Sequence, residues 1–104
     1  MNGVVPPSDQ PDLPSFEECL EGRFRVEAGH DTFVELTLIE ATALPARGNP
    51  SRAQPFSIVF RGPVNRPLPQ RSYMFEHETL GIFEMFIVPI APDEHGPRYE
   101  AIFN

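Results

Sequence analysis

Apolar and polar side chains alternate through most of the chain beyond residue 22, and this period of two constrains the fold more than any other feature. Alternation with this period is typical of β-strands that turn one face to a core and the other to water. Five alternating rows are predicted to point inward: Phe24 and Val26; Val34, Leu36 and Leu38; Phe56, Ile58 and Phe60; Tyr73, Phe75 and His77; Tyr99, Ala101 and Phe103. Each row predicts one strand.

A sixth strand is predicted over residues 82–90, where the pattern is different. This stretch is apolar on both faces except at Glu84, so we expect it to be sandwiched between layers or central in a sheet. Pro89 has no N–H to give to a ladder, which predicts an edge position or a bulge at the end of this strand.

Proline and glycine separate the predicted strands. With 13 Pro and 7 Gly in 104 residues, the chain cannot form an all-helical bundle. One short helix is predicted before the first strand, with Ser15 as its N-cap, Glu18 as the capping-box partner and Gly22 at its end. The sequence therefore predicts a mainly antiparallel, all-β fold of about six strands, a small barrel or a sandwich, with one short N-terminal helix.

The chain divides into an arm and one domain. Residues 1–14 hold four prolines and few bulky apolar side chains, so we expect an extended or disordered arm there and a single β domain over 15–104. The N-terminus has no signal-peptide pattern, and the longest apolar stretch, residues 85–91, is too short to span a bilayer. We expect a protein that is cytoplasmic at synthesis, and later assembly onto an exported structure stays open.

The charge is unevenly distributed. Eight Arg, no Lys and 15 acidic residues give a net charge of −7, which argues against nucleic-acid binding. No acidic residue lies between Glu40 and Glu76, whereas five arginines do, so this segment carries +5 and the rest of the chain −12. The arginines that we predict to contact a partner are Arg47, Arg52, Arg66 and Arg71. The segment is either an ordinary pair of solvated loops or a docking surface for an acidic protein partner or a second copy, with no role at a membrane.

Histidines and acidic residues stand close together at two places. In Glu76-His77-Glu78 the side chains of a strand alternate, so the three cannot bind one ion; we expect both glutamates to pair with cross-strand arginines and His77 to lie at the rim of the core. A metal site built from the turns at 30–31 and 93–95 is a less favoured alternative.

No motif for catalysis or for a cofactor stands out. Cys19 is the only cysteine, has no neighbouring histidine and lies among acidic residues, so we expect it to be buried and structural. We therefore expect a protein that is not an enzyme and has no cofactor. The alternative function is a small-ligand or glycan-binding β-barrel whose mouth carries Tyr73, His77 and Tyr99.

The second half of the chain also resembles a small bacterial family of uncharacterised domains. The resemblance covers residues 15–104 and is carried by Glu21-Gly22-Arg23-Phe24, Phe56–Pro63, Leu68–Tyr73, His77–Phe83, Phe86–Ile90 and Tyr99–Asn104. Members of that family are associated with genes for phage-tail-collar-like fibre proteins. The resemblance implies an accessory or structural role in a tail-like or fibre assembly, and it supplies no catalytic residues.

Overall fold

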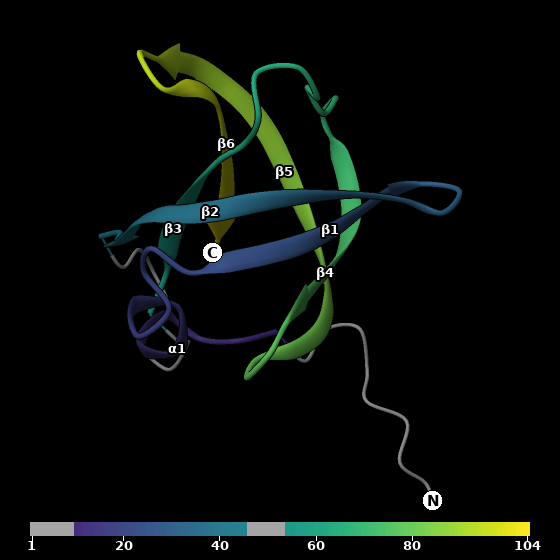
Figure 1. Ribbon diagram of the computed structural model, residues 1–104. Helices are drawn as coiled ribbons and strands as arrows, with labels where there is room; N and C mark the ends of the chain where they lie inside the picture. The colour runs from purple at the N-terminus through teal and green to yellow at the C-terminus, as the bar shows by residue number, and fades with distance from the viewer. Residues whose placement is uncertain (1–9, 46–53) are drawn as a thin grey trace, which may run out of the picture.

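The computed structural model describes residues 10–45 and 54–104, which form six strands and one helix (Figure 1). The helix and strands are α1 (Leu13–Glu17), β1 (Arg23–Gly29), β2 (Thr32–Ala43), β3 (Phe56–Arg61), β4 (Arg71–His77), β5 (Gly81–Asp93) and β6 (Gly96–Phe103). The prediction of an all-β fold with about six strands and one short helix is confirmed.

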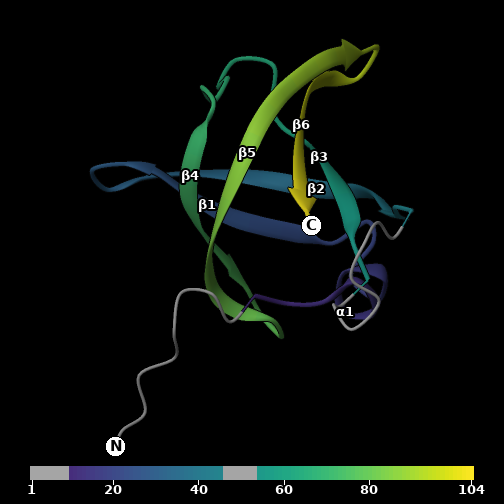
Figure 2. The same ribbon diagram turned by 180° about the vertical axis from the view of Figure 1, so that it is seen from behind.

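The six strands close into a barrel in the order β1-β2-β3-β6-β5-β4, and every neighbouring pair is antiparallel. Of the two predicted architectures the chain adopts the barrel. The views from both sides show β1 and β2 crossing the barrel while β5 and β6 rise on the opposite wall (Figure 2). Closure gives every strand two neighbours, which removes the free edges of an open sheet.

The predicted inward rows fill the barrel with hydrocarbon. No polar or charged side chain among the described residues is buried. The fully buried members include Phe24, Phe60 and Phe75, and the Phe24 and Phe60 rings meet edge to face with centroids 5.2 Å apart. Burial of each such ring contributes roughly 2–3 kcal/mol, so the aromatic rows supply much of the driving force for folding.

Helix α1 closes the lower end of the barrel in Figure 1. Phe16 is fully buried, and its ring centroid lies 5.9–6.3 Å from those of four other phenylalanines. Leu13, which the predicted arm included, is also part of the core, and Cys19 packs against it while only partly buried. No helix in the described part of the chain has the length and apolar character needed to cross a membrane.

The predicted helix start was wrong by three residues. The N-cap is Asp12, not Ser15, because the Asp12 carboxylate accepts hydrogen bonds from the Ser15 N–H (3.1 Å) and the Ser15 hydroxyl (2.7 Å). These bonds lower the pKa of Asp12. Pro14 fits the first turn, where its missing N–H is not needed, and Glu18 forms the C-cap rather than a capping box.

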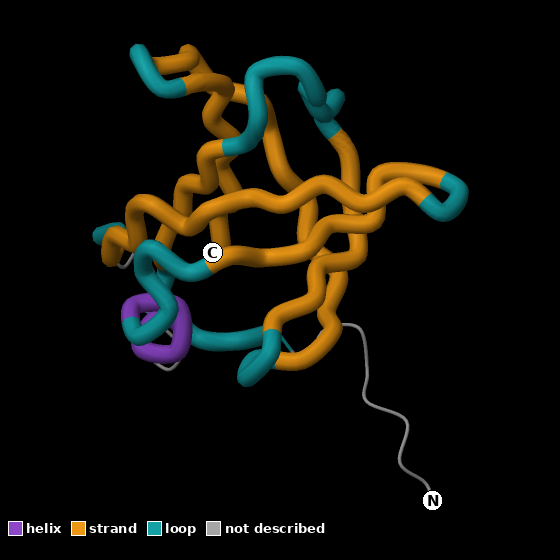
Figure 3. The backbone as a smooth tube through the Cα atoms, viewed as in Figure 1, coloured by secondary structure: helices purple, strands orange, loops and turns teal. Residues whose placement is uncertain are grey.

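The loop of residues 62–70 covers the upper end (Figure 3). Leu68 is buried, and its N–H donates to the hydroxyl oxygen of Tyr99 at 2.9 Å. The Tyr73 hydroxyl donates to the carbonyl of Pro69 at 2.6 Å. The lower end of the barrel is therefore closed by apolar side chains of α1. The upper end is closed by Leu68 and by loop backbone that the two tyrosine hydroxyls hold in place.

The expectation that strand 82–90 is covered on both faces was wrong. Phe83, Met85 and Ile87 point into the core, but Ile82 is 66% exposed and Phe86 49% exposed. The reason is that a barrel has one wall, so the outer face of β5 meets solvent even though β4 and β6 both pair with it. Pro89 lies beyond Ile87, the last β5 residue paired with β4, which agrees with the predicted edge position.

Candidate interaction surfaces

Two of the four arginines predicted to contact a partner are described. Arg66 and Arg71 are exposed near the loop that covers the upper end, and neither makes an ion pair with another described residue. The Arg71 guanidinium lies 4.8 Å from the centre of the Tyr73 ring, which holds it at the surface. Arg47 and Arg52 lie outside the described residues.

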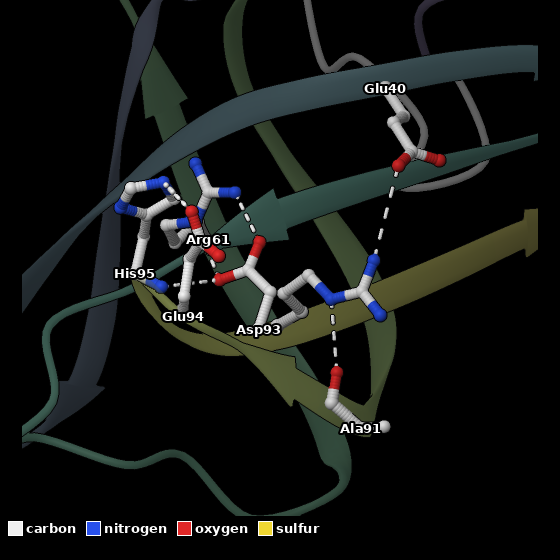
Figure 4. Close-up of polar contacts among 7 residues, drawn as sticks. Glu40, Arg61, Ala91, Asp93, Glu94 and His95 are labelled. Atoms are coloured by element: carbon white, nitrogen blue, oxygen red, sulfur yellow. Dashed lines mark hydrogen bonds and ion pairs between the residues drawn. The ribbon is translucent and has the colours of Figure 1, made fainter.

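A third arginine of the basic segment is used inside the fold. Arg61 on β3 donates through both Nε, at 3.3 Å, and Nη2 to the carboxylate of Asp93 on β5, and both side chains are less than one-third exposed (Figure 4). Asp93 also accepts the N–H of His95 at 2.8 Å. The hydrogen bond from Arg61 holds the pKa of Asp93 well below its usual range, and the same bond raises the pKa of Arg61. This arginine is not free to contact a partner.

The three residues of the alternative ligand site do not share a cavity. Tyr73 and Tyr99 are buried beneath the upper loop, where burial raises the pKa of the Tyr73 phenol. His77 lies at the other end of β4, with its ring 4.5 Å from that of Phe24. Four residues of strand span about 13 Å, so the shared face of Tyr73 and His77 does not bring them together. A ligand or glycan site built on these three residues has no support in this geometry.

His77 instead holds the turn that follows β4. Its Nδ1 accepts hydrogen bonds from the backbone N–H groups of Thr79 (3.1 Å) and Leu80 (3.2 Å). The predicted place at the rim of the core is confirmed, and the ring orders the β4–β5 turn. Glu76 lies on the opposite face and pairs with Arg25 of β1 at 4.0 Å, as predicted. The same prediction was wrong for Glu78, which lies in the turn beyond β4 and forms no ion pair with another described residue.

The two turns considered for a metal site lie apart. The β1–β2 and β5–β6 hairpins point in different directions (Figures 1 and 2), and His95 pairs with the adjacent Glu94 at 3.3 Å. Within residues 10–45 and 54–104, no three acidic, histidine or cysteine side chains gather closely enough to hold an ion.

Exposed apolar side chains on the outer wall were missed by the sequence reasoning. Phe33 carries the Arg25 guanidinium 3.9 Å above its ring, and Met74 is exposed on β4. On the opposite wall Phe86 and Ile102 are 49% and 55% exposed. The sequence does indicate that Ile102 is exposed, because in a strand it lies on the same face as the charged Arg98 and Glu100, which point outward.

A groove opens between these last two side chains. Its volume is about 480 Å³, and its walls come from Gln10, Met85, Phe86, Val88, Glu100, Ala101, Ile102 and Phe103. It lies between two strands of the barrel wall, whereas two further hollows are lined by residues around α1 and by mostly polar residues near Arg71.

The comparisons with known proteins locate the chain in a family but give it no activity. One family model, a domain of unknown function (DUF6916), matches residues 11–103. Neither a curated protein nor a solved structure matches the chain.

Proposed function

The chain belongs to the DUF6916 family, a domain of unknown function, and we propose from its geometry that it is a non-catalytic structural or interaction module. The observation that carries this proposal is the closed interior, where no charged side chain of the described residues is buried and the two tyrosine hydroxyls bind backbone. Catalysis needs polar groups that converge on one point. Here the tyrosine hydroxyls and the imidazole that could have formed such a site each bind backbone at separate ends of the barrel.

In this proposal the residues that bind a partner lie on the outer surface of the barrel. Arg66 and Arg71 present guanidinium groups suited to bidentate pairing with carboxylates. A protein with an acidic surface is the partner that fits them, and a second copy qualifies because the chain outside residues 41–75 carries −12. The resemblance to domains linked with fibre genes supports a place as an accessory component of a phage-tail-like or fibre assembly.

The test is salt-dependent association through these arginines. Sedimentation velocity would follow the protein alone and with soluble poly-glutamate as an acidic partner, at about 0.01 M and about 1 M salt, where the Debye length falls from about 30 Å to about 3 Å. We expect association at low salt that is lost in the double variant Arg66→Glu, Arg71→Glu. Arg23→Glu is the matched control, since it reverses an exposed charge on β1. A strict monomer that ignores poly-glutamate at both salt concentrations would contradict the proposal.

A further inference from the structure

The ladder between β5 and β6 stops before either strand ends. Its pairs run from Asp93 and Gly96 down to Val88 and Glu100, and no further pair forms between the described residues of these strands. The same register would next bring Ile87 beside Ala101 and then Phe86 beside Ile102. We call this unpaired stretch of the barrel wall, bounded by Glu84–Phe86 and by Ile102, the seam.

The backbone groups of the seam point into it. Successive residues of an antiparallel strand direct their N–H and C=O to opposite neighbours. The Gly62 N–H binds the Pro97 carbonyl at 3.0 Å, so the odd-numbered residues of β6 face β3 and Ile102 faces β5. Pro89, without an N–H, suits a position that faces away from β6, which leaves Phe86 facing it.

Gln10 confirms the direction on the β5 side. Its side-chain amide donates to the carbonyl of Glu84, where the register would otherwise bring the N–H of Asn104. A side chain thus substitutes for one missing ladder bond. The N–H and C=O of Phe86 and of Ile102 have no ladder partner among the described residues, and unpaired backbone of this kind is a template for another chain.

The groove supplies pockets for side chains on both sides of such a chain. Met85 and Ala101 form its floor from the core side, while Phe86 and Ile102 flank it on the outside. Glu100 lines its wall, and Glu84 is exposed two residues before Phe86 on the same outward face of β5, so two carboxylates stand near the groove. The side chains of a bound strand would point alternately to the apolar floor and to the carboxylates beside the groove. The groove therefore favours a segment with an apolar residue between two basic residues.

We propose that the seam binds one extended segment of another polypeptide by β-strand addition. Two or three residues of that segment pair with the backbone of Phe86 and Ile102, a small apolar side chain meets Met85 and Ala101, and Arg or Lys on either side meets Glu84 and Glu100. This rests on the proposed function in that both assign the chain to interaction, but it uses a different wall from Arg66 and Arg71.

The test uses three synthetic peptides and fluorescence anisotropy. The first is capped Arg-Val-Arg-Val-Arg, the second replaces every Arg with Glu, and the third repeats the first with N-methylated backbone amides. We expect the first to bind and the other two to lose affinity about tenfold or more. We also expect hydrogen exchange at the N–H groups of Phe86 and Ile102 to slow when the first peptide is added. Failure of the first peptide to bind, or equal binding of its N-methylated form, would overturn the proposal.

Variants place the binding at the seam. Phe86→Ser and Ile102→Ser should each weaken binding of the first peptide several-fold. Ile82→Ser, which removes a more exposed apolar side chain from β5 outside the groove, should not. The Arg66→Glu, Arg71→Glu variant should bind the peptide as the parent does. Loss of peptide binding there would assign the peptide to the arginine surface and overturn the seam. A parent protein that binds the peptide but does not associate with poly-glutamate at low salt would overturn the proposed arginine surface alone.

Discussion

Phe16 should contribute more to the free energy of unfolding than any exposed phenylalanine, because it closes the lower end of the barrel. Its ring is fully buried against four others. Removing it loses about 2–3 kcal/mol of transfer free energy and leaves a cavity whose cost brings Phe→Ala substitutions to about 3–5 kcal/mol. A chain of this length has a total free energy of unfolding of roughly 5–15 kcal/mol, so Phe16→Ala should remove about a fifth of it or more.

The measurement is equilibrium urea denaturation followed by circular dichroism, with Phe86→Ala as the control. Phe86→Ala removes the same ring from a half-exposed position on the outer wall, so it should lower the free energy of unfolding by about 1 kcal/mol and leave no cavity. The m-value should stay constant in both variants if the barrel remains the unfolding unit. If Phe16→Ala does not fold, Phe16→Leu should lose less free energy of unfolding than Phe16→Ala would, but still more than Phe86→Ala. Equal losses at positions 16 and 86 would refute the role of α1 as the closure of the barrel.

Three further predictions concern the ion pair and the upper loop. Arg61 lowers the pKa of Asp93, so the ionised Asp93 carboxylate stabilises the fold above its unfolded-state pKa near 3.9, and this stabilisation is lost as the pH falls below that value. The urea midpoints of the parent and of Asp93→Asn should therefore converge from pH 6 toward pH 2. A constant difference between the two midpoints would contradict this. Tyr99→Phe leaves the buried N–H of Leu68 unpaired, which should cost about 1–3 kcal/mol and speed hydrogen exchange at that amide; unchanged exchange would show that the hydroxyl does not hold the loop. Gly62→Ala places a methyl group 2.8 Å from a side-chain carbon of Leu36 and 3.1 Å from the Tyr99 ring, which should lower the free energy of unfolding by about 1–3 kcal/mol and so lower the urea midpoint. A midpoint equal to that of the parent would mean that the core gives way there.

Much of the fold was predictable because its signals are local. The alternation in Val34, Leu36 and Leu38 fixes which face of a strand is buried, whatever the strand later pairs with. The same alternation placed Glu76 on the face opposite His77, which led to the correct cross-strand pairing with an arginine. Face is a property of the residue and its immediate neighbours, so sequence is enough to assign it.

Depth along the barrel was not predictable in this way. Tyr73 and His77 share a face, yet one lies under the upper loop and the other beside Phe24 at the lower end. Their separation depends on how the strands are staggered around the closed barrel, and that stagger follows from pairings between distant parts of the chain, such as β3 with β6. The helix start failed for a smaller reason. Asp12 and Ser15 are both good N-caps, and the buried Leu13 favours the earlier one.

The wrong expectation about β5 carries more information than the correct ones. A strand that is apolar on both faces is typical of a covered position, yet the barrel leaves the outer side chain of Phe86 half-exposed. The fold does not require that side chain, because Met85 and Ile87 already complete the inner face. The same strand is the one whose ladder stops early, and Phe86 is the first residue beyond the stop whose backbone groups face β6. Within the described residues, an apolar side chain without a cover and a backbone without a ladder partner therefore coincide at Phe86, and a single added strand would satisfy both.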